Sequence, residues 1–116
     1  MNKYTIYCTE EQTRKALELG APIEKHYKGT DGLTRYYEDV IPTAEEMIGW
    51  IEEQGILVDT SAAFLHTNTP SYLYRIGFRF NDYVSDVVDY PSRKEATLAA
   101  IDAALEYLSR NKKEEE

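Results

Sequence analysis

Cys8, His26 and His66 are the residues that could act as a nucleophile, a general base or a metal ligand. Cys8 is the only thiol, and it alternates in phase with Tyr4 and Ile6, a pattern typical of a small core residue. The two histidines lie 40 residues apart, and neither has a second ligand at helical metal-site spacing. We therefore expect a buried cysteine, no metal and no cofactor.

The acidic residues and glycines lack a catalytic arrangement. Glu38-Asp39 and Glu45-Glu46 are neighbours in the chain, whereas a glycoside hydrolase brings its two carboxylates from separate elements. The aspartates of residues 82–89 lack the glycine and terminal glutamate of a calcium loop. The six glycines are scattered and form no phosphate-binding loop. These observations predict a protein that is not an enzyme.

The net charge of −8 is concentrated in one segment. Residues 36–62 contain seven acids and no Lys or Arg, whereas residues 1–35 total +1 and residues 63–116 total −2. Ten tyrosines outnumber three phenylalanines and one tryptophan, and tyrosine suits interfaces because its ring is apolar and its tip is polar. We expect a protein partner or a homodimer. The expected contact residues are Glu45, Glu46, Glu52 and Glu53 on one helix, with His66 and Asn68 in the connection 65–71.

Arg75 and Arg79 share one face of a predicted strand, about 13 Å apart, which is too far for one bidentate clamp. Pairing with acids of a neighbouring strand accounts for them. The alternative is a surface for an anion or an acidic partner, with tyrosines beside it.

Three helices are predicted by the same start signal. The capping boxes Thr9–Gln12, Thr43–Glu46 and Ser92–Glu95 each place a hydroxyl three residues before Glu or Gln. The first two helices should cover 10–19 and 44–54, because a glycine that can adopt positive φ follows each. Apolar residues at steps of three and four predict the last helix over 93–110.

Strands are expected in the intervening segments. Alternation predicts strands at 4–8, 56–65, 72–80 and 83–90, and Asp31-Gly32 predicts a hairpin over 26–41. Tight turns between neighbouring strands imply an antiparallel sheet. The expected fold is α+β, a two-layer sandwich of order β-α-ββ-α-βββ-α. Its last helix should cover the face of Tyr74, Ile76 and Phe78.

The chain length of 116 residues predicts a single domain over 1–110, with a charged, frayed tail at 111–116. One cysteine excludes a disulfide framework, and no apolar run approaches the roughly 20 residues of a membrane span. Met1-Asn-Lys-Tyr4 does not begin a signal peptide, so we expect a cytoplasmic protein without membrane contact.

Residues 47–108 read helix, three-stranded meander, helix, and the last helix begins Ser92-Arg-Lys-Glu-Ala96 and contains Ala99-Ala100. This order resembles the double-stranded RNA-binding domain. The resemblance implies that Arg93 and Lys94 contact phosphates, and the basic residues Arg75 and Arg79 would extend that surface. The helix 44–54 would enter the minor groove, yet it carries acids and no base, which disfavours a polyanion.

Three longer sequence segments, residues 7–23, 42–55 and 92–108, carry a second resemblance. They resemble a group of small uncharacterised proteins encoded by prophages and mobile elements of gut Bacteroides-type bacteria. The resemblance covers about half the chain and implies a bacterial cytoplasmic setting and an accessory role, with no catalytic residue. A third interpretation is that the clustered acids imitate DNA and so block an enzyme that acts on nucleic acid. Seven acids are few for such a role.

Overall fold

The computed structural model describes residues 5–63, 70–78, 83–85 and 90–115. It contains the helices α1 (Glu10–Glu18), α2 (Ala44–Glu53) and α3 (Arg93–Glu115). The strands are β1 (Lys25–Asp31), β2 (Thr34–Asp39), β3 (Leu57–Ala63), β4 (Ser71–Gly77) and β5 (Tyr83–Ser85). The predicted α+β class with antiparallel strands is confirmed.

The first two helices begin and end as their sequences predict. Thr9 and Thr43 each form a complete capping box with the residue three positions on. Gly20 and Gly55 follow the helices with φ of +95°, and the amides of Gly20 and Ala21 donate to the Leu17 and Ala16 carbonyls. This Schellman arrangement satisfies carbonyls that the end of a helix leaves without partners.

The longest helix, α3, begins after Ser92, whose hydroxyl accepts from the Glu95 amide at 3.1 Å. It continues to Glu115, five residues beyond the predicted end at 110. Residues 111–115 contain no glycine or proline, and Lys and Glu favour helix, so nothing local stops it earlier. Ala96, Ala100, Ile101, Ala104 and Leu105 are fully buried along its inner face.

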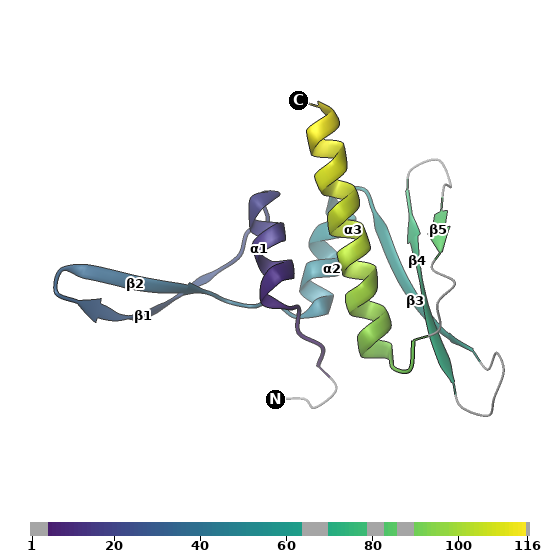
Figure 1. Cartoon of the computed structure of the whole chain (residues 1–116), viewed down its shortest axis with the longest axis horizontal. Helices are drawn as coiled ribbons and strands as arrows, with labels where there is room; N and C mark the ends of the chain where they lie inside the picture. Colours follow the sequence, from purple (N-terminus) through teal and green to yellow (C-terminus); the bar gives the residue numbers. More distant parts are fainter. Residues whose placement is uncertain (1–4, 64–69, 79–82, 86–89, 116) are drawn as a thin grey trace.

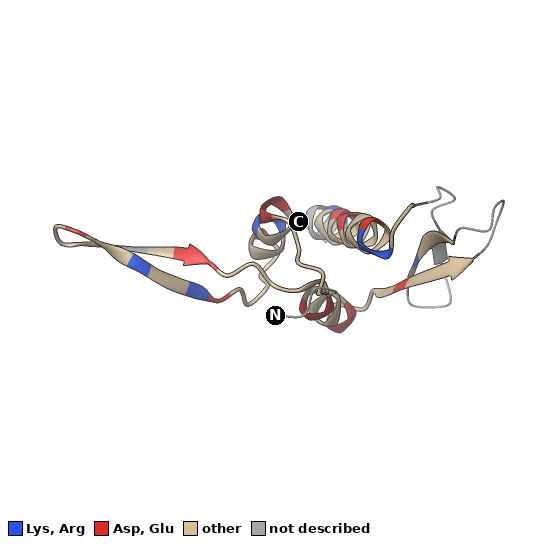
Figure 2. Cartoon of the chain, turned by 90° about the horizontal axis from the view of Figure 1, so that it is seen from below, with Lys and Arg blue, Asp and Glu red and all other residues tan. Residues whose placement is uncertain are grey.

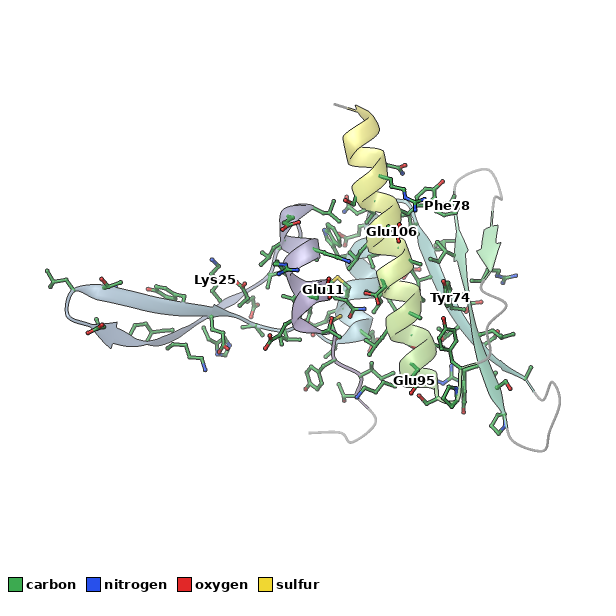
Figure 3. All side chains as sticks on the ribbon, viewed as in Figure 1. Glu11, Lys25, Tyr74, Phe78, Glu95 and Glu106 are labelled. Carbon is green, nitrogen blue, oxygen red and sulfur yellow. The ribbon has the colours of Figure 1, made fainter. Side chains whose placement is uncertain are left out.

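The core lies between the helices and the sheet β3-β4-β5, as Figure 1 shows. Helix α3 packs on β3 and β4, while α1 and α2 pack on α3. Ile76 is 2% exposed, and the ring of Phe78 stacks on Tyr107 with centroids 4.2 Å apart. Tyr74 on β4 and Phe78, the residue after that strand, point toward α3 in Figure 3, so the predicted covered face is confirmed.

Two expected strand arrangements differ from the structure. The segment 4–8, where described, forms only an isolated bridge, with Cys8 N donating to Pro42 O and Ala44 N donating to Ile6 O. Helices begin at Glu10 and Ala44, so this pairing has no room to extend into a strand. The hairpin β1-β2 is also no part of the sandwich, because it forms a separate two-stranded sheet.

That hairpin, which we call the arm (residues 25–39), projects away from the rest of the chain in Figure 1. The molecule measures 59 × 39 × 18 Å, and its radius of gyration is 16.7 Å. A compact chain of this length would have a radius of gyration of roughly 13 Å. The arm lies along the longest axis of the molecule in Figure 1 and therefore contributes to this extended shape.

Candidate protein-interaction site

The acidic segment 36–62 is distributed over three elements of the structure. Its acids on β2 and β3 face bases: Glu38 lies 2.7 Å from Lys28, and Asp39 lies 3.9 Å from Lys25. Asp59 lies 3.5 Å from Arg75, the cross-strand pairing that the sequence indicates. The remaining acids of this segment are all on helix α2, where the negative charge is therefore concentrated.

Helix α2 presents two different faces because its residues repeat at helical spacing. Ala44, Met47 and Ile51 are buried against the core. Glu45, Ile48, Gly49 and Glu52 follow at i, i+3, i+4 and i+7 and therefore share a second face. In Figure 2, α2 carries acidic residues and no basic one.

A groove of about 810 Å³ runs along this second face. The segment Thr5-Ile6, the face of α2 and Thr97 at the start of α3 line it. Ile6 and Ile48 are half-buried, and Glu45 and Glu52 are exposed carboxylates one above the other. The groove thus combines an apolar floor with negative charge, and its volume lies within the usual range for binding pockets.

Gly49 lines the groove without a side chain. A Cβ placed there would meet no atom within 4 Å, so the glycine is not required by packing within the chain. Glycine in the middle of a helix costs about 0.5–1 kcal/mol relative to alanine. Its presence exposes helix backbone at the groove and allows another molecule to approach closely.

The four predicted glutamates have unequal roles. Glu45 and Glu52 line the groove, whereas Glu46 completes the capping box of Thr43. Glu53 is exposed on α2 outside the groove lining. Within the described part of the chain, no ion pair involves any of these four carboxylates. His66 and Asn68 lie outside the described residues.

The basic residues of the nucleic-acid alternative are not gathered on one surface. The Arg93 guanidinium lies 5.3 Å from the centre of the Tyr72 ring and 3.5 Å from Thr60 Oγ1. Arg75 alternates with Tyr72 and Tyr74 along β4 and pairs with Asp59, so it faces the other side of the sheet. Lys94 is exposed, and Arg79 lies outside the described residues.

Cys8 is 5% exposed, as the sequence predicts, and its thiol lies 3.8 Å from the Thr43 carbonyl. Burial, together with the charges of Glu46 and Asp102, raises the pKa of the Cys8 thiol to about 12. Such a thiol stays protonated and is a poor nucleophile. Among the described residues, no group of three or more His, Cys, Asp or Glu is placed to hold a metal ion.

The groove contains residues that sequence reasoning missed, namely Ile6, Ile48 and Gly49 as lining. The spacing of Ile48 and Gly49 between two glutamates was a local signal for them, whereas Ile6 reaches the groove only through tertiary packing. No helix in the described ranges combines the length and apolarity needed to cross a bilayer. Comparisons with protein-family models, curated proteins and solved structures find no match for this chain.

Proposed function

We propose that this protein is a non-enzymatic interaction domain whose α2 groove receives a basic, amphipathic segment of a partner protein. The observation that carries the proposal is the placement of Glu45 and Glu52 beside an apolar groove whose described lining contains no base. An amphipathic helix lays its apolar face into such a groove, and its flanking charges set the orientation. An accessory role in a bacterial mobile element, which the sequence resemblance implies, is compatible with such a domain.

The spacing of the two carboxylates specifies the partner. Glu45 and Glu52 lie seven residues apart, which is two turns or about 10 Å along the helix axis. A partner helix with Lys or Arg at i and i+7, and apolar residues between them, can place one cation beside each carboxylate. Exposed pairs of this kind are screened by salt, so binding should weaken as ionic strength rises.

The test uses a 15-residue amphipathic peptide with lysines at i and i+7 and leucines at i+3 and i+4, titrated into the full chain. We expect backbone amide NMR shifts to change at residues 5–6, 43–52 and 97, and the same peptide with glutamates in place of lysines to have no effect. Glu45→Lys with Glu52→Lys should weaken binding about tenfold or more.

Glu53→Lys reverses one charge on the same helix outside the groove lining, so it is the matched control for Glu45→Lys and Glu52→Lys made singly. It should leave affinity within about twofold of the original protein. Equal losses in the groove and control variants would indicate a response to net charge alone. That result, or no binding at low salt, would overturn the proposal.

Double-stranded RNA binding is the competing interpretation, and it receives less support because Arg75 and Arg93 face opposite sides of the sheet. A gel shift with duplex RNA at low salt separates the two, since phosphate contacts are strongest there.

A further inference from the structure

The arm is a two-stranded ribbon that stands free of the rest of the described chain except at its base, where Glu38 and Asp39 share a hollow with α1. Its residues are exposed wherever the structure describes their side chains, apart from half-buried Gly29. Tyr27 is 57% exposed, Tyr37 is 54% exposed and Leu33 at the tip is completely exposed. Figure 3 shows the side chains of the arm, as a group, standing clear of the helices. An isolated hairpin is only marginally stable in water, so this one needs another surface.

The two edges of the arm differ in their suitability for pairing. β1 contains a register shift between Tyr27 and Gly29, where φ is +154°, and it also carries two lysines. Bulges and lysines are the devices by which proteins block an exposed strand edge. β2 (Thr34–Asp39) has no glycine or proline, and the described pairing shows no bulge on its side. Its outer edge is therefore open to a further strand.

The positive and negative charges of the arm are equal in number, and β2 has its base near one end and its acids at the other. The arm has three bases and three acids, so the remainder of the chain carries the whole net charge of −8. Lys25 and Lys28 pair with Asp39 and Glu38. Arg35, at the opposite end of β2, makes no ion pair with any described residue. Arg35 is therefore available to form an ion pair with a carboxylate from another strand.

We propose that the outer edge of β2 pairs antiparallel with β2 of a second copy, with the two-fold axis at Tyr37. Antiparallel pairing of a strand with itself places the basic end of one copy beside the acidic end of the other. With Tyr37 opposite its symmetry mate, Arg35 lies opposite Asp39 of the second copy, and the reverse contact follows by symmetry. The arms then form one four-stranded sheet between two acidic bodies that would otherwise repel.

This register also accounts for the exposed apolar residues. Tyr27 faces Tyr37 within the arm, with ring centroids 5.8 Å apart, so pairing creates a row of four tyrosines on one face. Leu33 comes level with Ile41 of the second copy. Ile41 lines a hollow of about 200 Å³ at the base of the arm, together with Thr13, Arg14 and the three acids Glu10, Glu38 and Asp39. The tip leucine of each copy thus comes beside one apolar side chain, Ile41 of the second copy, in a hollow whose other described lining residues are polar or charged.

The size of the contact sets the expected strength. β2 has six residues, which span roughly 20 Å. A single pairing of that length with its flanking side chains buries less than the roughly 1,600 Å² of a standard interface. We therefore expect a reversible dimer whose population rises with concentration, not a permanent one.

The test measures self-association by sedimentation across protein concentrations, using two complementary variants. Arg35→Glu places like charges opposite each other twice per dimer and should weaken self-association about tenfold or more. Lys25→Glu with Asp39→Lys keeps the pair within the arm and the net charge, but places a cation at position 39 opposite Arg35, so it should weaken self-association similarly. An equimolar mixture of the two variants should restore dimers, because both interchain contacts become attractive.

Arg110→Glu is the matched control, since it makes the same charge change on α3 far from the arm and should leave self-association unchanged. Leu33→Asn changes no contact within the described chain and should weaken the dimer while the circular dichroism stays the same. A monomer at all concentrations, a dimer insensitive to the Arg35 change, or a mixture that does not recover would each overturn the proposal. None of these outcomes depends on whether the α2 groove binds a basic peptide.

Discussion

The side-chain amide of Gln12 donates to Asp102 Oδ1 at 2.8 Å and to the Leu98 carbonyl at 2.9 Å. Its Oε1 accepts from the Thr9 amide at 3.0 Å, so a side chain that is 1% exposed has its polar atoms satisfied. The contact joins α1 to α3 across 90 residues of chain.

Gln12→Ala should lower the free energy of unfolding by about 2–3 kcal/mol. The substitution removes the cap on the Thr9 amide, leaves the Leu98 carbonyl and Asp102 without their partner, and opens a cavity. Urea unfolding followed by circular dichroism measures the change. Gln54→Ala is the matched control, because Gln54 is exposed and its amide lies 3.5 Å from the Trp50 carbonyl. It should shift stability by less than about 0.5 kcal/mol, and equal effects at the two sites would refute the role given to Gln12.

Two glycines with open space around them should respond in opposite directions to alanine. A Cβ meets nothing within 4 Å at Gly20 or at Gly49, so neither change is steric. Gly20 has φ of +95°, where alanine is strained, and Gly20→Ala should destabilise by about 1–2 kcal/mol. Gly49 lies within α2, and Gly49→Ala should stabilise by about 0.5–1 kcal/mol. Thermal unfolding of both variants checks the signs. If Gly49→Ala destabilised the chain, the groove would not be the open space described.

The Cys8 thiol should make stability depend on pH at alkaline values. Its pKa rises from 9.0 to about 12 on folding, so below pH 9 both states are protonated and the thiol adds no pH dependence. Between pH 9 and 12 the unfolded thiol ionises and the folded thiol does not, so stability falls as pH rises. From pH 9 to 10.5 this loss should be about 1–2 kcal/mol. Urea unfolding at these two pH values measures it.

Cys8→Ala separates the thiol from the tyrosines and lysines that titrate in the same range. The alanine variant should lose less stability than the original protein over this pH interval, and the difference belongs to Cys8. The folded thiol should also react slowly with a disulfide reagent at pH 8 and quickly in urea. Rapid reaction in the folded state would contradict the burial of Cys8.

The sequence predicted those features that depend on neighbouring residues. Capping boxes and following glycines located α1 and α2, since a helix end is satisfied by groups within a few residues. Alternation along residues 72–78 identified the face of β4 that α3 covers. The burial of Gln12 had no such signal, because its Asp102 partner lies on another helix. The capping box already accounts for a glutamine at position 12, so the sequence gives no reason to expect its second contact with α3.

The arm shows the opposite limit of sequence reasoning. Asp31-Gly32 located the hairpin, and Gly32 does adopt a positive φ of +61° in its turn. Nothing in the alternation of its residues distinguishes a strand that will be covered by helices from one that remains uncovered. For a similar reason, the sequence predicted only part of the groove. The glutamates were visible in the sequence, whereas the floor needs Ile6 from another segment.

Leu105 and Leu33 are the two extremes of leucine exposure in the described chain, and they provide the last prediction. Leu105 is fully buried on the inner face of α3, whereas Leu33 is completely exposed at the tip of the arm. Leu105→Ala should cost about 2–5 kcal/mol, because it removes buried apolar surface and leaves a cavity. Leu33→Ala should leave the unfolding free energy unchanged at a protein concentration where the chain is monomeric, since no apolar contact is lost. At high concentration the original protein should gain stability from association and the Leu33 variant should gain less. If Leu33→Ala lowered the unfolding free energy equally at all protein concentrations, Leu33 would contact its own chain. That result would contradict the role of Leu33 in self-association.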